Sequence, residues 1–116
     1  YQYGLPGTFA PIADYELLSR AVETAKRQGT NVVVGNVLSS DVFYNAMGNV
    51  NDLWRGMGVL AVEMEAAALY MNAAKAGKKA LCMLTISDHL YTNEHLSAED
   101  RQLGFHKMME IALELA

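Results

Sequence analysis

Cysteine is almost absent from the sequence, which has one among 116 residues. A single cysteine excludes a disulfide within the chain and favours a reducing compartment, so we expect a soluble protein of the cytoplasm. Long apolar runs are also absent: none reaches the roughly 18 residues that a membrane-spanning helix needs. The first residues lack the charged and apolar regions of a signal peptide.

An excess of basic residues is lacking too. The chain has nine lysines and arginines against 13 aspartates and glutamates, a formal net charge of −4, and its pI is near 5.2. Such a chain carries no basic footprint for nucleic acid, because binding to nucleic acid rests on lysine and arginine contacts with its phosphates. We therefore exclude nucleic acids and anionic membranes as partners.

Motifs for metals and for nucleotide phosphates are missing. His89, His95 and His106 do not have the i, i+4 spacing of a metal site, and the lone cysteine has no partner motif. The sequence also contains no GxGxxG or Walker-type loop. We expect no metal and no cofactor, and no residue pattern indicates where a phosphate would bind.

The most informative stretch present is Val62–Tyr70, where an apolar run turns into a helix. Val59–Val62 is typical of a short strand, and Ala66–Ala76 consists almost wholly of helix formers. Glu63 and Glu65 therefore lie at a strand-to-helix junction, where free N–H groups and the helix dipole favour ionised carboxylates. Such a carboxylate can accept hydrogen bonds from a pair of hydroxyls. The alternative is that both are ordinary first-turn glutamates. Because the helix is apolar on nearly every side, we expect it to be buried, with its first turn lining a crevice.

The residues before this stretch alternate between helix and strand patterns. Asp14 is the expected N-cap of an amphipathic helix that stops at Gly29. Asn31–Leu38 is rich in β-branched residues and is typical of a strand covered on both faces. A short helix is expected around Val50–Arg55, with Trp54 in the core.

The residues after it continue the alternation. Lys79–Ser87 is apolar almost throughout and predicts another buried strand, and Ser97 begins a final helix. The apolar residues of that helix that are expected to face inward are Phe105, Met108, Met109, Ala112, Leu113 and Ala116. The order of elements predicts a single α/β domain, with helices on the faces of a mainly parallel sheet.

Candidate functional residues follow the two predicted strands, since ligands bind at the carboxyl ends of strands in open α/β sheets. Phe43 and Tyr44 could stack on a planar ring, and the alternative is that they pack in the core. Asp88 is placed like a catalytic acid, and the alternative is a Ser-Asp turn begun by Ser87. Arg101 lies on the inward stripe of the final helix and needs an acceptor there, for which Asp88 is the nearest candidate. In the alternative, Arg101 extends out to solvent.

Three segments in this order resemble the C-terminal half of the hexameric bacterial purine nucleoside phosphorylases: Val62–Ala67, Thr85–His89 and Ala98–Gln102. The resemblance runs across essentially the whole chain and includes the residues at 43–45. It implies a three-layer α/β/α fold, of which residues 1–116 form the C-terminal half of a single domain.

That family cleaves purine (2′-deoxy)ribonucleosides with inorganic phosphate, giving the free base and (deoxy)ribose 1-phosphate. The resemblance implies two catalytic residues: Asp88, which would protonate or hydrogen-bond N7 of the leaving purine, and Arg101, which would pair with Asp88 on closure. Glu65 would accept hydrogen bonds from the ribose hydroxyls. The other substrate-binding residues that it implies are Phe43, Tyr44, Val62, Glu63, Met64 and Ser87.

The family's phosphate-binding residues belong to an N-terminal half that is not in this sequence. The chain opens without an initiator methionine and in an irregular stretch, so we expect a fragment of a longer enzyme, or else a short relative with another role. The resemblance implies a homohexamer with phosphate as co-substrate. Two alternatives stay open: a hydrolytic purine nucleosidase of the same superfamily, and a non-catalytic chain with only a binding or oligomer-packing role.

Overall fold

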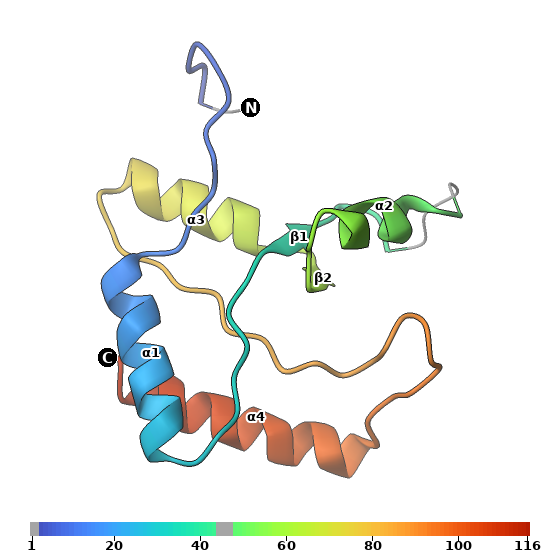
Figure 1. The fold of residues 1–116 in the computed structure, drawn as a ribbon. Helices are drawn as coiled ribbons and strands as arrows, with labels where there is room; N and C mark the ends of the chain where they lie inside the picture. Colours follow the sequence, from blue (N-terminus) through green and yellow to red (C-terminus); the bar gives the residue numbers. More distant parts are fainter. Residues whose placement is uncertain (1–2, 44–47) are drawn as a thin grey trace. The chain divides into compact units, whose positions relative to one another are not determined.

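The computed structural model describes residues 3–43 and 48–116. Their elements, labelled in Figure 1, are α1 (Tyr15–Arg27), β1 (Val37–Ser39), α2 (Val50–Gly56), β2 (Ala61–Glu63), α3 (Ala66–Lys75) and α4 (Ala98–Leu113). All four predicted helices are therefore confirmed. Among these residues, none of the helices combines the length and the apolar character that crossing a bilayer requires.

The elements divide between two compact units. The first consists of Tyr1–Asp14 and Val34–Ala80, and the second of Tyr15–Val33 and Leu81–Ala116. The first unit thus holds β1, β2, α2 and α3, whereas the second holds α1 and α4.

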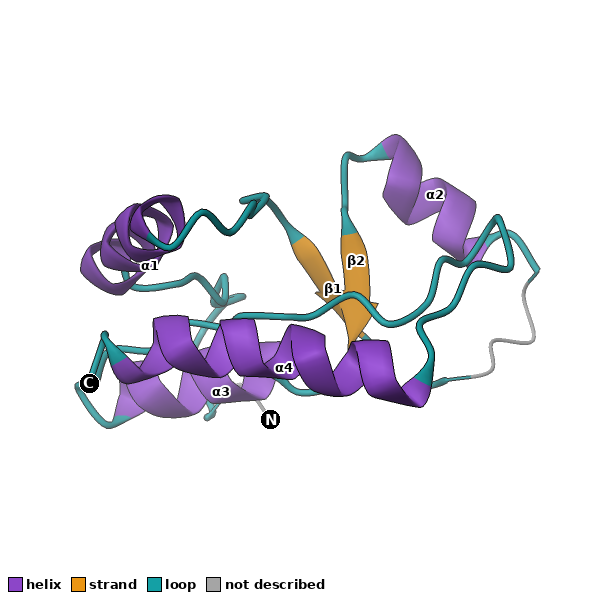
Figure 2. Ribbon diagram, turned by 90° about the horizontal axis from the view of Figure 1, so that it is seen from below, coloured by secondary structure: helices purple, strands orange, loops and turns teal. Residues whose placement is uncertain are grey.

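A parallel pair of strands forms the sheet of the first unit. In Figure 2 the strands β1 and β2 lie side by side, with Val37 opposite Ala61 and Ser39 opposite Glu63. This pairing confirms the predicted α/β class with parallel strands. The predicted strand over Asn31–Leu38 is wrong for most of its length, because only its last two residues belong to β1. The valines that precede β1 in the chain, Val32, Val33 and Val34, are exposed and so are not covered on both faces.

The predicted buried strand over Lys79–Ser87 is also wrong. No residue of this segment is in a strand, and only the next residue, Asp88, makes an isolated bridge, to His95. An apolar β-branched sequence describes a good strand surface, but a strand also needs a neighbour with which its backbone can pair. The described residues supply that neighbour for β1 and β2 alone.

The predicted burial of α3 and of Trp54 is wrong as well. Ala66 is the only buried residue of α3, and Leu69 keeps 46% of its surface exposed. Trp54, in α2, is 44% exposed. Two short strands offer too little apolar surface to cover an apolar helix on several sides. A prediction from the residue types of α3 alone therefore overestimates how far the helix is buried.

Gly77 ends α3 through a Schellman motif. Its φ is +64°, its N–H donates to the carbonyl of Ala74 at 3.1 Å, and the N–H of Lys78 donates to the carbonyl of Ala73 at 2.8 Å. This left-handed conformation strains any residue with a Cβ, which is why glycine is preferred there.

We expect Gly77→Ala to lower the free energy of unfolding by about 1 kcal/mol, because alanine is strained at a positive φ. The matched control is Gly56→Ala, which places the same residue at an ordinary helical position in α2 and should raise stability by up to about 1 kcal/mol. Urea titration of both variants measures the difference. Equal effects of the two substitutions would contradict this account of the α3 terminus.

In the second unit, α1 packs on α4. The core consists of Ala21 and Ala25 of α1 and Ile111 of α4, with Leu81 and Met83 packed against it. The predicted inward stripe of α4 is therefore wrong, because the helix is rotated about its axis and buries a different face. Leu113 and Met109, expected inside, are 76% and 52% exposed. The small residues of α1 select the α4 face that comes closest, which the apolar pattern of α4 alone cannot reveal.

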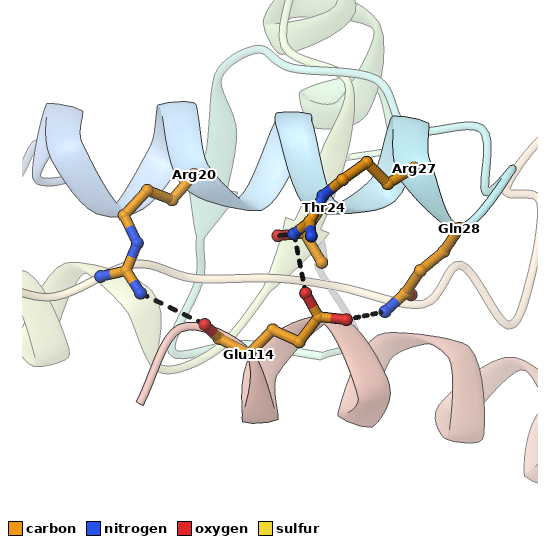
Figure 3. Close-up of polar contacts among 5 residues, drawn as sticks. All are labelled: Arg20, Thr24, Arg27, Gln28 and Glu114. Carbon is orange, nitrogen blue, oxygen red and sulfur yellow. Dashed lines mark hydrogen bonds and ion pairs between the residues drawn. The ribbon is translucent and has the colours of Figure 1, made fainter.

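Glu114, just after α4, accepts hydrogen bonds from residues of α1 and from the residue that follows α1 (Figure 3). Its carboxylate accepts hydrogen bonds from Arg27 Nη2 at 2.7 Å and from Gln28 Nε2 at 2.8 Å. Its backbone carbonyl accepts one from Arg20 Nη2 at 3.2 Å. Arg27 also donates to the hydroxyl of Thr24, which is buried. The C-terminal end of α4 is thus fixed to α1 by polar contacts around a small apolar core.

Candidate functional site

The parallel register brings Ser39 and Glu63 together at the carboxyl ends of β1 and β2. They are direct partners in the sheet, and the N–H of Ser40 donates to the carbonyl of Glu63 at 2.9 Å. The Ser39 hydroxyl donates a hydrogen bond to Glu63 Oε1. The pairing places a hydroxyl and a carboxylate at the point where the chain turns into α3.

These two side chains cap α3. Glu63 Oε2 accepts hydrogen bonds from the N–H groups of Glu65 at 2.7 Å and Ala66 at 2.6 Å, and Ser39 Oγ accepts one from Ala67 at 2.9 Å. The residue at the N-cap position, Glu65, makes no capping bond with its own side chain. The N–H groups of Glu65, Ala66 and Ala67 are therefore satisfied from the strands, not from the helix itself.

The surroundings of Glu63 favour its ionised form. Partial burial acts to raise the pKa of this carboxyl, but the hydrogen bonds from Ser39 and from the N–H groups of Glu65 and Ala66 outweigh burial and lower the pKa below its usual value of 4.5. Each of these donors bonds more strongly to a carboxylate than to a carboxylic acid. Glu63 is thus an anion whose oxygens are both engaged within the protein.

Glu65 differs in both respects. It is exposed, and its carboxylate has no hydrogen-bond partner among the residues that the structure describes. Beside it in the chain, Met64 is 42% exposed and Val62 40%. Phe43 of the same unit is 77% exposed, and the remaining candidate of that stretch, Tyr44, lies outside the described residues. A carboxylate with open acceptor positions beside exposed apolar groups can bind a ligand that carries hydroxyls next to an apolar part.

In the second unit the predicted pairing of Asp88 with Arg101 is confirmed. Arg101 Nη2 donates to Asp88 Oδ1 at 3.2 Å, and the two side chains are 41% and 54% exposed. The hydroxyl of Ser87 donates to the other oxygen, Asp88 Oδ2. Arg101 Nε is buried and has no hydrogen-bond partner within the described ranges. The pair is accessible to a ligand, and its carboxylate is oriented by two donors.

The start of α4 positions Arg101. Ser97 is the N-cap, as predicted: its Oγ accepts a hydrogen bond from the N–H of Asp100 at 3.0 Å, and its carbonyl accepts one from the N–H of Arg101 at 3.0 Å. One turn further on, α4 comes close to the segment that leads to Asp88, since a Cβ on Gly104 would lie 2.9 Å from Cγ2 of Thr85. Capping and close approach together set where the guanidinium points.

The structure thus groups the candidate residues in two sets, one in each unit. The first set is Ser39, Glu63 and Glu65, with Val62 and Met64 beside them in the chain. The second set is Ser87, Asp88 and Arg101. Residue patterns did not single out Ser39. The available signal was its place directly after an apolar run, the same position that drew attention to Glu63. Among the described residues, no group of three His, Cys, Asp or Glu side chains could hold a metal ion.

Comparison with known proteins identifies the family. The sequence pattern of the phosphorylase superfamily matches residues 2–115. The relatives named purine nucleoside phosphorylase DeoD-type include that of Clostridium novyi, 50% identical over 108 residues, which are 93% of this chain and 46% of the relative. That of Bacillus subtilis is 52% identical over 105 residues, 90% of this chain and 45% of the relative. That of Shewanella baltica is 50% identical over 108 residues, 93% of this chain and 46% of the relative.

The chain spans about half the length of the curated relatives that it matches. The family match nevertheless covers it almost from end to end and includes both sets of candidate residues. The chain therefore belongs to the phosphorylase superfamily.

Proposed function

We propose that this chain takes part in the phosphorolytic cleavage of purine (2′-deoxy)ribonucleosides, giving the free purine and (deoxy)ribose 1-phosphate. The observation that carries the proposal is the identity of about half its residues, over nine tenths of its length, to relatives named purine nucleoside phosphorylase. The accessible pair of Asp88 and Arg101 supports it, because this reaction needs a donor for the leaving base.

Asp88 and Arg101 act on the base. As the glycosidic C1′–N9 bond breaks, its electron pair moves onto the purine, and negative charge develops on the ring. Asp88, which enters the step protonated, transfers its proton to N7 as the bond breaks, so the base leaves as a neutral molecule and Asp88 becomes a carboxylate. Arg101 orients the Asp88 side chain and stabilises its charge once the proton has moved. A phosphate oxygen then forms the new bond to C1′ of the oxocarbenium-like sugar.

Glu65 binds the sugar. Its carboxylate, with open acceptor positions, takes hydrogen bonds from the ribose hydroxyls, and Met64 packs on the apolar face of the sugar. Both oxygens of Glu63 accept hydrogen bonds within the protein, and these bonds also fix the backbone that carries Glu65. The residues that we assign to the surroundings of the base are Phe43, Tyr44, Val62, Glu63 and Ser87.

The rest of the catalytic unit lies beyond these residues. We assign residues 1–116 to the C-terminal half of a single nucleoside phosphorylase domain, which supplies the base and ribose side of the site. The support for this is the share of its relatives that the chain spans. The phosphate-binding residues are then contributed by the other half, and the working protein is a homohexamer of the cytoplasm.

The test is to purify the natural polypeptide that contains Asp88, measure its intact mass, and follow release of hypoxanthine from inosine with and without phosphate. We expect a mass well above 12.7 kDa and release that requires phosphate and yields ribose 1-phosphate. Release that ignores phosphate would replace the proposal with a hydrolytic nucleosidase. Nucleoside binding without turnover would replace it with a binding role.

A further inference from the structure

The loop that follows Asp88 is closed by backbone hydrogen bonds on both sides of that residue. The N–H of Leu96 donates to the carbonyl of Ser87 at 2.8 Å, and the N–H of His89 donates to the carbonyl of Glu94 at 2.8 Å. Asp88 lies between these two bonds and faces His95 in an antiparallel bridge. The direction of the Asp88 side chain therefore depends on the loop staying closed.

The imidazole of His89 holds the tip of this loop. Its Nδ1 accepts hydrogen bonds from the N–H groups of Tyr91 at 3.2 Å and Thr92 at 3.1 Å, and the Tyr91 ring stands edge-on to it, with the ring centroids 6.3 Å apart. A backbone N–H can only donate, so Nδ1 must keep its lone pair. These two bonds therefore require a neutral imidazole with its proton on Nε2. Aspartate and asparagine side chains close turns in the same way, by accepting hydrogen bonds from backbone N–H groups a few residues further on.

His95 in the same loop has the opposite requirement. Its Nδ1 lies 3.2 Å from the carbonyl oxygen of Asn93, which can only accept, so this nitrogen must donate. A protonated His95 keeps that bond, whereas a protonated His89 loses both of its bonds. Asp88 is next to His89 in the chain, and the N–H of His89 donates to the carbonyl of Glu94. Arg101 is paired with Asp88, and the Glu94 carboxylate accepts the hydroxyl of Thr92 at 2.7 Å.

We propose that His89 is a positioning residue for Asp88, and that protonation of its Nδ1 opens the loop and releases the Asp88 side chain. This rests on the proposed function for the role of Asp88, but the closing of the loop does not. Loss of the two bonds affects the residues that act on the purine. Turnover should therefore fall at acidic pH, while nucleoside binding through Glu65 is retained.

Three variants test the proposal in the natural polypeptide. His89→Asn keeps a side-chain acceptor for the two N–H groups but does not titrate, His89→Ala removes the acceptor, and His95→Asn is the matched control in the same loop. For inosine phosphorolysis at neutral pH, we expect His89→Ala to lower kcat about tenfold with little change in KM. His89→Asn should retain the rate within about threefold and lose the fall in kcat that we expect for the wild type on acidification. His95→Asn should keep that fall.

Hydrogen–deuterium exchange over residues 88–97, corrected for the intrinsic pH dependence of exchange, gives a readout that does not depend on activity. Exchange should increase in His89→Ala at all pH values, increase in the wild type only on acidification, and stay low in His89→Asn. The proposal is overturned if His89→Asn keeps the acid fall of the wild type, or if exchange in His89→Ala matches the wild type at neutral pH. A wild type that shows this exchange pattern without phosphorolysis would refute the proposed function and leave the closing role of His89 standing.

Discussion

Replacing Asp88 with alanine is expected to lower kcat for inosine phosphorolysis by about 10²–10⁴-fold, the usual contribution of a positioned general acid. The reason is that the purine would then leave with its negative charge unneutralised. Steady-state kinetics on the natural polypeptide measure the effect. Because the proposal assigns Asp88 to the leaving base and not to the sugar, KM for the nucleoside should change far less than kcat.

Arg101 provides the internal check on that result. Arg101→Ala should also lower kcat, and the double variant should be little worse than Asp88→Ala alone, since the two side chains act as a pair at 3.2 Å. Asp52→Ala, an exposed carboxylate in the first turn of α2, is the control and should leave kcat unchanged. Normal turnover of inosine by Asp88→Ala would remove Asp88 from the catalytic site.

Replacing Glu63 with alanine is expected to cost about 2 kcal/mol of folding free energy. Its carboxylate satisfies the N–H groups of Glu65 and Ala66 and takes the Ser39 hydroxyl, and Ala66 is only 3% exposed, so water cannot easily replace the lost bond. Loss of a helix cap and of hydrogen bonds to a charged group both act in this direction. Glu63→Gln should cost less, because the amide oxygen can still accept.

Glu65→Gln is the matched control for Glu63, a change of the same kind two residues away. Its carboxylate makes no hydrogen bond within the described chain, so stability in urea should change by less than about 0.5 kcal/mol. In kinetic assays the two substitutions should rank the other way round: Glu65→Gln should raise KM for the nucleoside more than Glu63→Gln does. Equal destabilisation by the two substitutions would contradict the assignment of Glu63 as the cap and Glu65 as the free acceptor.

The Glu63 contribution should also depend on pH. Because hydrogen bonding lowers the folded-state pKa below the usual 4.5, the stabilisation by ionised Glu63 is complete above about pH 4.5 and is lost as the pH falls through the folded pKa. The stability difference between wild type and Glu63→Gln should therefore be largest above pH 4.5 and shrink in acid. Urea titrations at several pH values check this, and a difference that grows in acid would show that the sign is wrong.

Features of the site that depend on neighbours in the chain could be predicted from the sequence. Ser97 caps α4 and Gly77 ends α3 because both motifs are made by residues within a few positions of each other. The carboxylates at the start of α3 were predicted for the same reason. The pairing of Asp88 with Arg101, 13 residues apart, was predicted because Arg101 needs an acceptor and Asp88 is the nearest candidate in the chain.

Features that depend on distant segments were decided only by the tertiary structure. The strands predicted over Asn31–Leu38 and Lys79–Ser87 did not form as expected, because a strand requires a partner that its own residues do not specify. The buried face of α4 was set by the small residues of α1. The partnership of Ser39 with Glu63, 24 residues apart, exists only because the parallel register aligns β1 with β2.

The division between the two glutamates has the same origin. The sequence by itself determined that two carboxylates stand at the entry to α3, since a helix start favours negative charge wherever it occurs. It did not determine which of them is bound within the protein and which is open to a ligand. That was decided by the strand pairing, which places the Ser39 hydroxyl against Glu63, while the Glu65 carboxylate has no hydrogen-bond partner among the residues that the structure describes. A hydrogen bond between segments far apart in the chain needs both backbones to be held in register.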